Sequence, residues 1–214
     1  IVIFCYFNTK NLKLSHSTLT FVENLRMNAS DLLHLSDQFG GPLYVYNAEK
    51  IESQYDRLIN AFSKVERLQI NYAVKALSNI SVLKYFHKLG SGLDTVSLQE
   101  VQLGLAAGFE PNRIIFTPNG VSIDEIEEVA TLGVQINIDN LSILEQFGTK
   151  HPTVPVCIRI NPHVMAGGNT NISVGHIDSK FGISIHQLPH LLRIIENTHM
   201  HINGIHMHTG SDIL

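Results

Sequence analysis

The sequence predicts an α/β protein built as a (β/α)8 barrel of the TIM type that stops after about six strands. From residue 43 onward, short β-rich runs alternate with segments of helical periodicity, and this alternation is typical of βαβ units in a parallel sheet. The turn after the expected strand at residues 69–75 is Lys75-Ala-Leu-Ser-Asn79. It lacks the glycine-rich loop that follows the first strand of a doubly wound nucleotide-binding sheet. Consecutive βα units without that loop favour the barrel.

The expected elements follow one another in a regular order. Strands are expected at residues 43–46, 69–75, 92–96, 113–117, 134–138, 156–161 and 204–208, and helices at 79–89, 98–107, 123–132, 141–147 and 185–196. The first strand follows Gly40-Gly41-Pro42, so we expect it to be separate from the barrel sheet. Asn47 and Asp139 occupy positions suited to helix N-caps. Three glycines occupy positions suited to helix C-caps: Gly90, Gly108 and Gly133.

The chain is expected to contain a lead-in and one incomplete barrel. Residues 1–40 read as an N-terminal extension and lead-in, with Met27 as a candidate for the natural start, and residues 41–214 as the partial barrel. A complete barrel takes roughly 250 residues, whereas this one begins near residue 69 and has only passed its sixth strand at Leu214. We therefore expect a fragment whose barrel is open by two strands and has exposed edges.

Composition argues against several functional classes. Lys and Arg total 15 against 19 Asp and Glu, a formal net charge of −4, and because the basic residues are dispersed no nucleic-acid partner is expected. The cysteines, Cys5 and Cys157, are too few and too far apart for a disulfide framework. The apolar opening at residues 1–7 is too short to span a membrane and lacks the basic start of a signal peptide. We expect a cytoplasmic protein with no membrane partner.

Polar side chains stand at the ends of several expected strands, where their surroundings are otherwise apolar. They are Lys75, Asp94, Arg159, His206 and His208. In a (β/α) barrel the carboxyl ends of the strands form the active-site face. Burial and neighbouring charges can turn a strand-end lysine into a usable amine nucleophile, which is what an aldehyde cofactor needs for a Schiff base. His206 and His208 are two residues apart, so they are expected to share one face of their strand.

Each of these residues also has a plain structural interpretation. Taken alone, Lys75 is more often a residue whose amine reaches solvent, and Asp94 or Arg159 is more often half of an ion pair. A metal site is another alternative, because two His-x-His pairs have strand spacing, His199 with His201 and His206 with His208. Zinc needs three or four converging ligands, and the two pairs flank opposite ends of the same strand. No metal is therefore expected.

Four motifs occur in order at successive strand ends: Tyr72-Ala-Val-Lys-Ala76, Gly92-Leu-Asp94 with Ser97 and Glu100, Ile158-Arg-Ile-Asn-Pro162, and His208-Thr-Gly-Ser211. This order resembles the fold-type III pyridoxal-phosphate enzymes, which include alanine racemase and the basic amino-acid decarboxylases. Within that group the chain is most similar to the diaminopimelate decarboxylases, on the evidence of residues 103–109, 111–120 and 171–183. The resemblance covers residues 41–214 and implies an alanine racemase-like barrel. The C-terminal β domain of such enzymes is absent from the sequence.

The resemblance implies a role for each matching residue. Lys75 would carry pyridoxal 5'-phosphate in a Schiff base and later protonate the product. His208 would stack on the pyridine ring, and Asp94 would lie near the lysine amine and help to hold its charge state. As catalytic residues the resemblance therefore implies Lys75, His208 and Asp94.

The remaining cofactor contacts implied by the resemblance are supporting ones. Ser211, together with the backbone at Gly210, would bind the phosphate, and a glycine and a hydroxyl beside free backbone N–H groups suit that task. Arg159 with Glu100 would form an inner supporting layer. The sequence departs from the family pattern at residues 98–99, where glycines are frequent, and at residue 212, where glutamine is common. The second departure bears on the detail of the phosphate site.

The resemblance implies a homodimeric enzyme that converts meso-diaminopimelate to L-lysine and CO2, the last step of lysine synthesis. The glycine-rich phosphate loop, the acid that meets the pyridine nitrogen and a cysteine from the partner subunit would lie beyond Leu214. The chain as given is therefore expected to be inactive by itself. Two alternatives stay open, a related decarboxylase acting on ornithine, arginine or carboxynorspermidine, and a non-catalytic relative that keeps the barrel.

Overall fold

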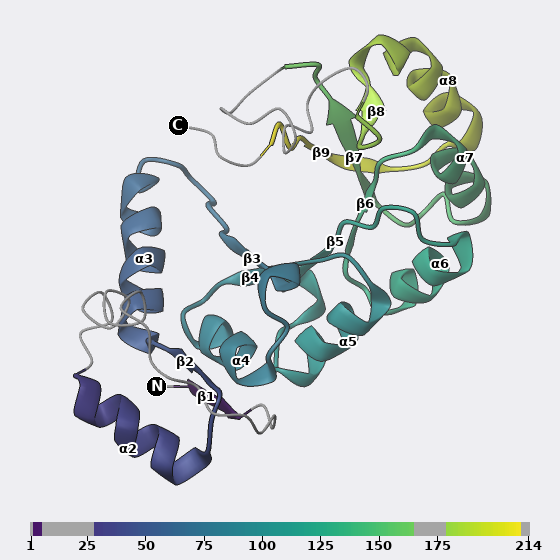
Figure 1. Ribbon diagram of the computed structural model, residues 1–214. Helices are drawn as coiled ribbons and strands as arrows, with labels where there is room; N and C mark the ends of the chain where they lie inside the picture. Colours follow the sequence, from purple (N-terminus) through teal and green to yellow (C-terminus); the bar gives the residue numbers. More distant parts are fainter. Residues whose placement is uncertain (1, 6–27, 165–178, 211–214) are drawn as a thin grey trace. The chain divides into compact units, whose positions relative to one another are not determined.

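The computed structural model describes residues 2–5, 28–164 and 179–210, which fall in two compact units, residues 1–68 and 69–214 (Figure 1). The predicted domain division between residues 40 and 41 stays a prediction. No helix in the described part of the chain is both long enough and apolar enough to cross a membrane.

The first unit contains a two-stranded antiparallel sheet and two helices. Strand β1 (Val2–Cys5) pairs with β2 (Leu43–Tyr46), and the helices are α2 (Ala29–Phe39) and α3 (Ala48–Ala61). The expectation that residues 43–46 form a strand outside the barrel sheet is confirmed. The predicted N-cap at Asn47 is also confirmed, because its side chain accepts a hydrogen bond from the Lys50 backbone N–H at 3.0 Å.

The second unit is built on a parallel sheet. Its strands are β3 (Asn71–Ala73), β4 (Gly92–Thr95), β5 (Ile114–Phe116), β6 (Gln135–Ile138), β7 (Val156–Asn161), β8 (Ile183–Ser184) and β9 (Ile202–His206). They run in the order β3-β4-β5-β6-β7-β8, with β9 also beside β7, and every pair is parallel. Within the described residues β3 pairs only with β4, so the barrel is partial, as predicted. The two-residue strand β8 was not predicted.

Five helices connect these strands: α4 (Ile80–Lys88), α5 (Leu98–Ala106), α6 (Ile123–Thr131), α7 (Leu141–Lys150) and α8 (Leu188–Thr198). Figure 1 shows them following one another along the outer side of the curved sheet. Residues 185–187, predicted as the start of the last helix, form a 3-10 turn instead. The predicted C-cap glycines are confirmed by their positive φ angles after α4, α5 and α6.

One predicted cap was wrong. The N-cap of α7 is Asn140, whose side chain accepts hydrogen bonds from Ser142 and Ile143 N–H. Asp139 lies one residue earlier, and its carboxylate accepts instead from the Asn119 side-chain amide at 2.8 Å. Both residue types suit an N-cap, so composition could not decide between neighbours.

The core lies between the sheet and the helices. Ile114 and Phe116 in β5 and Leu93 in β4 are fully buried on the helix side, and Gly104 of α5 lies close enough that a Cβ there would meet the Leu93 side chain. Because strand residues alternate between faces, the residues between them point to the inner side of the sheet. That alternation delivers Asp94, Asn137 and Arg159 to the inner side.

Candidate active site

Lys75 lies just past the end of β3, in the 3-10 turn Val74–Ala76. The prediction that the strand continues to residue 75 was therefore wrong, because the chain turns after Ala73 and Leu77 N–H donates to Val74 O at 3.0 Å. Val74 is fully buried and anchors the turn, whereas the Lys75 side chain is exposed. Tyr72 adds a second anchor, since its hydroxyl donates to Leu77 O. The lysine amine is thus held, accessible, at the carboxyl end of the first barrel strand.

Asp94, Thr117 and Asn137 form a hydrogen-bonded chain across three neighbouring strands, which we call the hydrogen-bonded row. Asp94 lies in β4, Thr117 directly follows β5, and Asn137 lies in β6. Thr117 Oγ1 donates to Asp94 Oδ1 at 2.7 Å, and Asn137 Nδ2 donates to Thr117 Oγ1 at 3.0 Å. Thr117 and Asn137 are only 8% and 5% exposed. These polar groups satisfy one another away from water.

Asp139, Arg159 and His206 form a second set, which we call the charged row. Arg159 in β7 is 7% exposed and lies in register with His206 in β9. Burial lowers the pKa of the Arg159 guanidinium, whereas Asp139 and then Asp94 raise it. Within the described residues no carboxylate oxygen comes within 4.0 Å of this guanidinium. The Arg159 Cζ lies 4.8 Å from the centre of the Phe181 ring, a cation–π distance.

Gly182 brings Phe181 to this position. Its φ is +82°, and a Cβ there would lie 2.9 Å from the Asn161 backbone N, so both the conformation and the close approach require glycine. The segment that carries Phe181 can therefore pack directly against the end of β7. This packing covers one side of Arg159.

His206 and His208 lie at the carboxyl end of β9, but only His206 is in the strand. The strand was predicted to reach residue 208, whereas it ends at His206, and the His208 side chain is exposed. Burial lowers the pKa of the His206 imidazole, followed by Arg159, while Asp94 and Asp139 raise it. Its Nδ1 is buried and has no hydrogen-bond partner in the described part of the chain.

Three other site residues influence the pKa of His208. It is lowered first by partial burial of the ring, then by Arg159 and Lys75, and Asp94 opposes these effects. Lys75, Asp94 and Arg159 are therefore all within electrostatic reach of His208. The structure thus brings together four residues that the sequence placed on separate strand ends. Their individual roles stay predictions.

Glu100 was expected to form a supporting layer together with Arg159. Glu100 lies in the first turn of α5, where its N–H donates to Ser97 Oγ at 3.2 Å and its Oε2 accepts from Val96 N–H at 2.8 Å. Its predicted partnership with Arg159 stays a prediction, and the carboxylates that raise the Arg159 pKa are Asp139 and Asp94.

The expected phosphate site at Gly210 and Ser211 is only half covered by the structure. Gly210 is buried with a φ of +148°, a conformation that favours glycine. Ser211 lies outside the described residues. The phosphate role of both stays a prediction.

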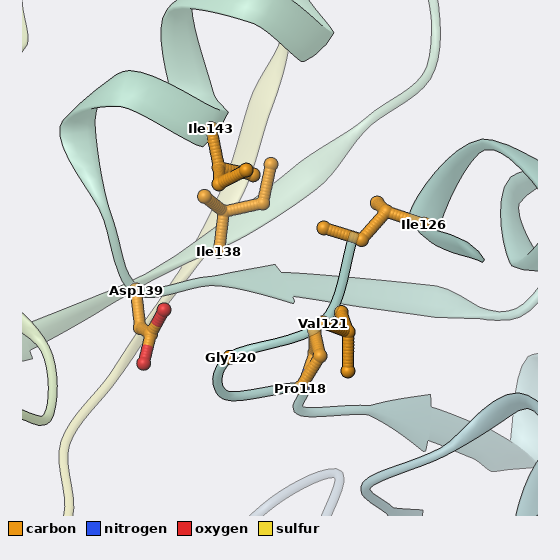
Figure 2. A pocket seen from close by; sticks show the side chains of 7 residues that line it. All are labelled: Pro118, Gly120, Val121, Ile126, Ile138, Asp139 and Ile143. Carbon is orange, nitrogen blue, oxygen red and sulfur yellow. The ribbon is translucent and has the colours of Figure 1, made fainter. Parts of the chain in front are cut away.

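A cleft opens at the carboxyl ends of β5 and β6, between the start of α6 and the start of α7 (Figure 2). Its empty volume, which includes space open to solvent, is about 230 Å³. The lining is apolar apart from Asp139, whose carboxylate lies at its rim in Figure 2. The cleft places the half-buried Asp139 at the carboxyl end of β6.

Sequence reasoning missed three residues of the site: Thr117, Asn137 and Asp139. A signal for the last two was present, because Gln135-Ile-Asn-Ile-Asp139 alternates polar with apolar residues through β6. The sequence contains no comparable signal for Thr117, because threonine is common in strands for packing reasons alone.

Comparison with known proteins agrees with this geometry. Residues 48–214 match the family of the pyridoxal-binding domain of pyridoxal-dependent decarboxylases. The diaminopimelate decarboxylase of Methanothermobacter thermautotrophicus is 37% identical over 193 residues, which cover 89% of this chain and 45% of that protein. The chain spans about half the length of the curated relatives that it matches.

Solved structures show the same relationship. The crystal structure of Helicobacter pylori diaminopimelate decarboxylase complexed with L-lysine matches with a TM-score of 0.71 and 31% identity, over 79% of this chain and 44% of that one. The arginine decarboxylase of Paramecium bursaria Chlorella virus matches with a TM-score of 0.64 and 25% identity, over 77% and 42%. The alanine racemase-like fold predicted from the sequence is thereby confirmed. The chain belongs to the pyridoxal-dependent decarboxylases, and residues 48–214 correspond to their pyridoxal-binding domain.

Proposed function

We propose that the protein containing this chain uses pyridoxal 5'-phosphate on Lys75 to decarboxylate meso-diaminopimelate to L-lysine and CO2. The observation that carries the proposal is the accessible Lys75 amine at the end of β3, within electrostatic reach of His208, in a chain similar to diaminopimelate decarboxylases. A homodimer in the cytoplasm is part of the same proposal, and neither assembly nor location follows from the described residues.

The residues present fit this cofactor. An aldehyde needs an accessible primary amine, and Lys75 supplies one. A phosphate needs backbone N–H groups that approach closely, and the buried Gly210, which has no side chain to block such an approach, fits that need. When bound, pyridoxal phosphate supplies a ring that accepts the electron pair left behind by the departing carboxylate.

The chain's own groups would then hold charge and protons around Lys75. The lowered pKa of His208 keeps its imidazole neutral near pH 7, so it can pack on an aromatic ring without adding a third positive charge beside Lys75 and Arg159. Asp94 provides the negative charge that offsets the cationic ones, since it raises the pKa of both Arg159 and His208. Lys75 is the group placed to give a proton back to the product carbon.

The proposed substrate is meso-diaminopimelate. Support comes from relatives that are diaminopimelate decarboxylases, one of them with bound L-lysine. The similarity to a viral arginine decarboxylase keeps the basic amino-acid decarboxylases as the second candidate. A substrate with a second amino-acid head should be favoured strongly if the site pairs with that head, because a shorter substrate leaves buried polar partners unpaired, a penalty of up to about 10⁴-fold.

The test uses the longest natural polypeptide that contains residues 1–214. Borohydride reduction followed by peptide mass mapping should place the pyridoxyl group on Lys75, and Lys75→Arg should abolish the adduct. Lys84→Arg is the matched control, because Lys84 is an exposed lysine on α4 and its replacement should leave the adduct intact. An adduct on another lysine overturns the assignment.

CO2 release is then compared for meso-diaminopimelate, ornithine, arginine and lysine under the same conditions. Release from meso-diaminopimelate should be far faster than from the other three. Comparable release from ornithine or arginine moves the protein to the second candidate function, and no release from any of them favours a non-catalytic relative. Residues 1–214 expressed alone are expected to release none.

A further inference from the structure

We propose that Thr117, backed by Asn137, is a positioning residue that holds the Asp94 carboxylate in place for the cofactor linkage at Lys75. The inference rests on the proposed function and adds two residues to which the family comparison gives no role. It stands on the hydrogen bonds of the row, Asn137 Nδ2 to Thr117 Oγ1 at 3.0 Å and Thr117 Oγ1 to Asp94 Oδ1 at 2.7 Å.

Hydrogen-bond donation in the row runs in one direction, from Asn137 to Thr117 and from Thr117 to Asp94. A threonine hydroxyl has a single proton to donate. Because Thr117 Oγ1 accepts from the Asn137 amide, its proton is free to go to Asp94 Oδ1. If the Asn137 side chain were reversed, its carbonyl oxygen would take that proton and Asp94 would face an oxygen lone pair. The observed orientation therefore directs the Thr117 proton at Asp94 Oδ1 and fixes the position of that oxygen.

The row occupies only one oxygen of Asp94. In the described residues its other oxygen, Oδ2, has no hydrogen-bond donor from the protein, so one side of the carboxylate is fixed and the other is available. Asp94 lies opposite Ala73 in the register of β3 and β4, and Lys75 follows two residues after Ala73. Asp94 therefore lies on the strand next to β3, close in register to the turn that carries Lys75.

The charged neighbours of Asp94 come from several elements. Lys75 follows β3, Asp139 follows β6, Arg159 lies in β7, and His206 and His208 lie in and after β9. Arg159 and both histidines respond electrostatically to Asp94. A change in the position of this one carboxylate therefore alters the charge balance of the whole site.

Removal of the Thr117 hydroxyl should disturb this balance without touching the cofactor. Valine has nearly the shape of threonine but cannot donate, so Asp94 loses its fixed partner and offsets positive charge at the lysine linkage less well. The pH at which the absorbance band of the bound cofactor titrates should then fall by roughly 0.5–1 unit. Serine keeps the hydroxyl and should restore the wild-type midpoint.

The experiment follows the cofactor absorbance against pH in the full-length holoprotein, for wild type, Thr117→Val and Thr117→Ser. Thermal melting of the same samples separates a change in folding from a change in the site. If Thr117→Val does not fold, Thr117→Ala takes its place, because it removes the same hydroxyl and adds no bulk. A residue with a merely structural role would lower the melting temperature and leave the midpoint unchanged.

The outcomes distinguish this inference from the proposed function. A lower midpoint for valine that serine restores supports the inference. A valine variant that binds cofactor and titrates like wild type overturns it and leaves the proposed function standing. A wild-type protein with no cofactor band overturns both.

Discussion

The hydrogen-bonded row and the charged row lie on neighbouring strands of one sheet but are stabilised differently. In the first, Asp94, Thr117 and Asn137 pair directly with one another. In the second, Arg159 is buried without a carboxylate within 4.0 Å in the described residues, and His206 has a buried Nδ1 without a partner there. Burial lowers the pKa of both groups.

The difference shows which polar groups of the site find their partners within the described part of the protein and which do not. A buried polar group without a partner costs free energy, and natural proteins tolerate this mainly where function requires it. The hydrogen-bonded row is a rigid support, because its polar groups already satisfy one another. We expect the charged row to be the part that gains partners when a charged ligand binds.

The largest effect is expected at Lys75, which follows the strand paired with the one that carries Asp94. Lys75→Ala should reduce decarboxylation by roughly 10³-fold or more, because it removes the covalent carrier and a proton donor together. The melting temperature without cofactor should change little, since the side chain is exposed. Steady-state CO2 release and apoprotein melting check the two parts. A variant within tenfold of wild-type activity contradicts the role given to Lys75.

A comparison of Arg159→Met with Asn137→Leu tests the contrast between the rows. Asn137→Leu should destabilise the protein by roughly 1–2 kcal/mol, because it removes a buried hydrogen bond. Arg159→Met should change the free energy of unfolding by less, since the lost charge was desolvated without a close partner, but it should weaken cofactor binding at least tenfold. Denaturant unfolding measures the free energy of unfolding, and cofactor titration measures the affinity for the cofactor.

Arg193→Met is the matched control, because Arg193 is exposed on α8, and it should alter neither quantity. Equal destabilisation by the Arg159 and Asn137 variants would show that the two rows do not differ in the way described.

The pH dependence of stability sharpens the comparison further. His206 has a pKa below the ordinary 6.5 in the folded protein, so between that lowered value and about 6.5 the unfolded chain binds more protons than the folded one. The free energy of unfolding therefore falls as the pH falls through this window. His206→Gln should flatten the dependence of the melting temperature on pH between about 5 and 7. An unchanged slope contradicts the assignment of a buried neutral imidazole.

The smallest effect is expected away from both rows. Lys150 and Glu127 form an ion pair at 2.7 Å on the outer helices, where solvent screens the charges and the net stabilisation is slight. Lys150→Ala should leave both the melting temperature and cofactor binding at wild-type values. A clear loss of cofactor binding in this variant would mean that effects on the site are not confined to the two rows.

Much of the fold and part of the site could be predicted from the sequence. Lys75, Asp94, Arg159 and His208 were identifiable because each is a charged or titratable residue in or just after an expected strand. Thr117 was not, because a threonine is common in strands, and for Asn137 the alternation of polar and apolar residues in β6 indicated only which face of the strand it occupies, not its partner. The two hydrogen bonds that join the row link residues 23 and 20 positions apart in the sequence, and no local pattern identifies such partners.

The elements that were missed have similar physical causes. Strand β8 has only two residues, too few for periodicity to show. The turn at Lys75 depends on the burial of Val74 and on the Tyr72 hydroxyl, and both are tertiary effects. Asn140 rather than Asp139 is the N-cap of α7, because the Asp139 carboxylate accepts a hydrogen bond from Asn119, a residue on another loop.

The register of the sheet has a consequence for the order in which the site is assembled during synthesis. From β3 to β7 each strand pairs with the next one along the chain, as in Asn71 with Gly92 and Ile136 with Val156, so each pairing can form soon after its second strand leaves the ribosome. Strand β9 instead returns to β7 across a longer span, Val156 to Ile202. We expect Asp94, Thr117 and Asn137 to be linked in the nascent chain before His206 has been translated. The hydrogen-bonded row would then exist before the last residue of the charged row is added.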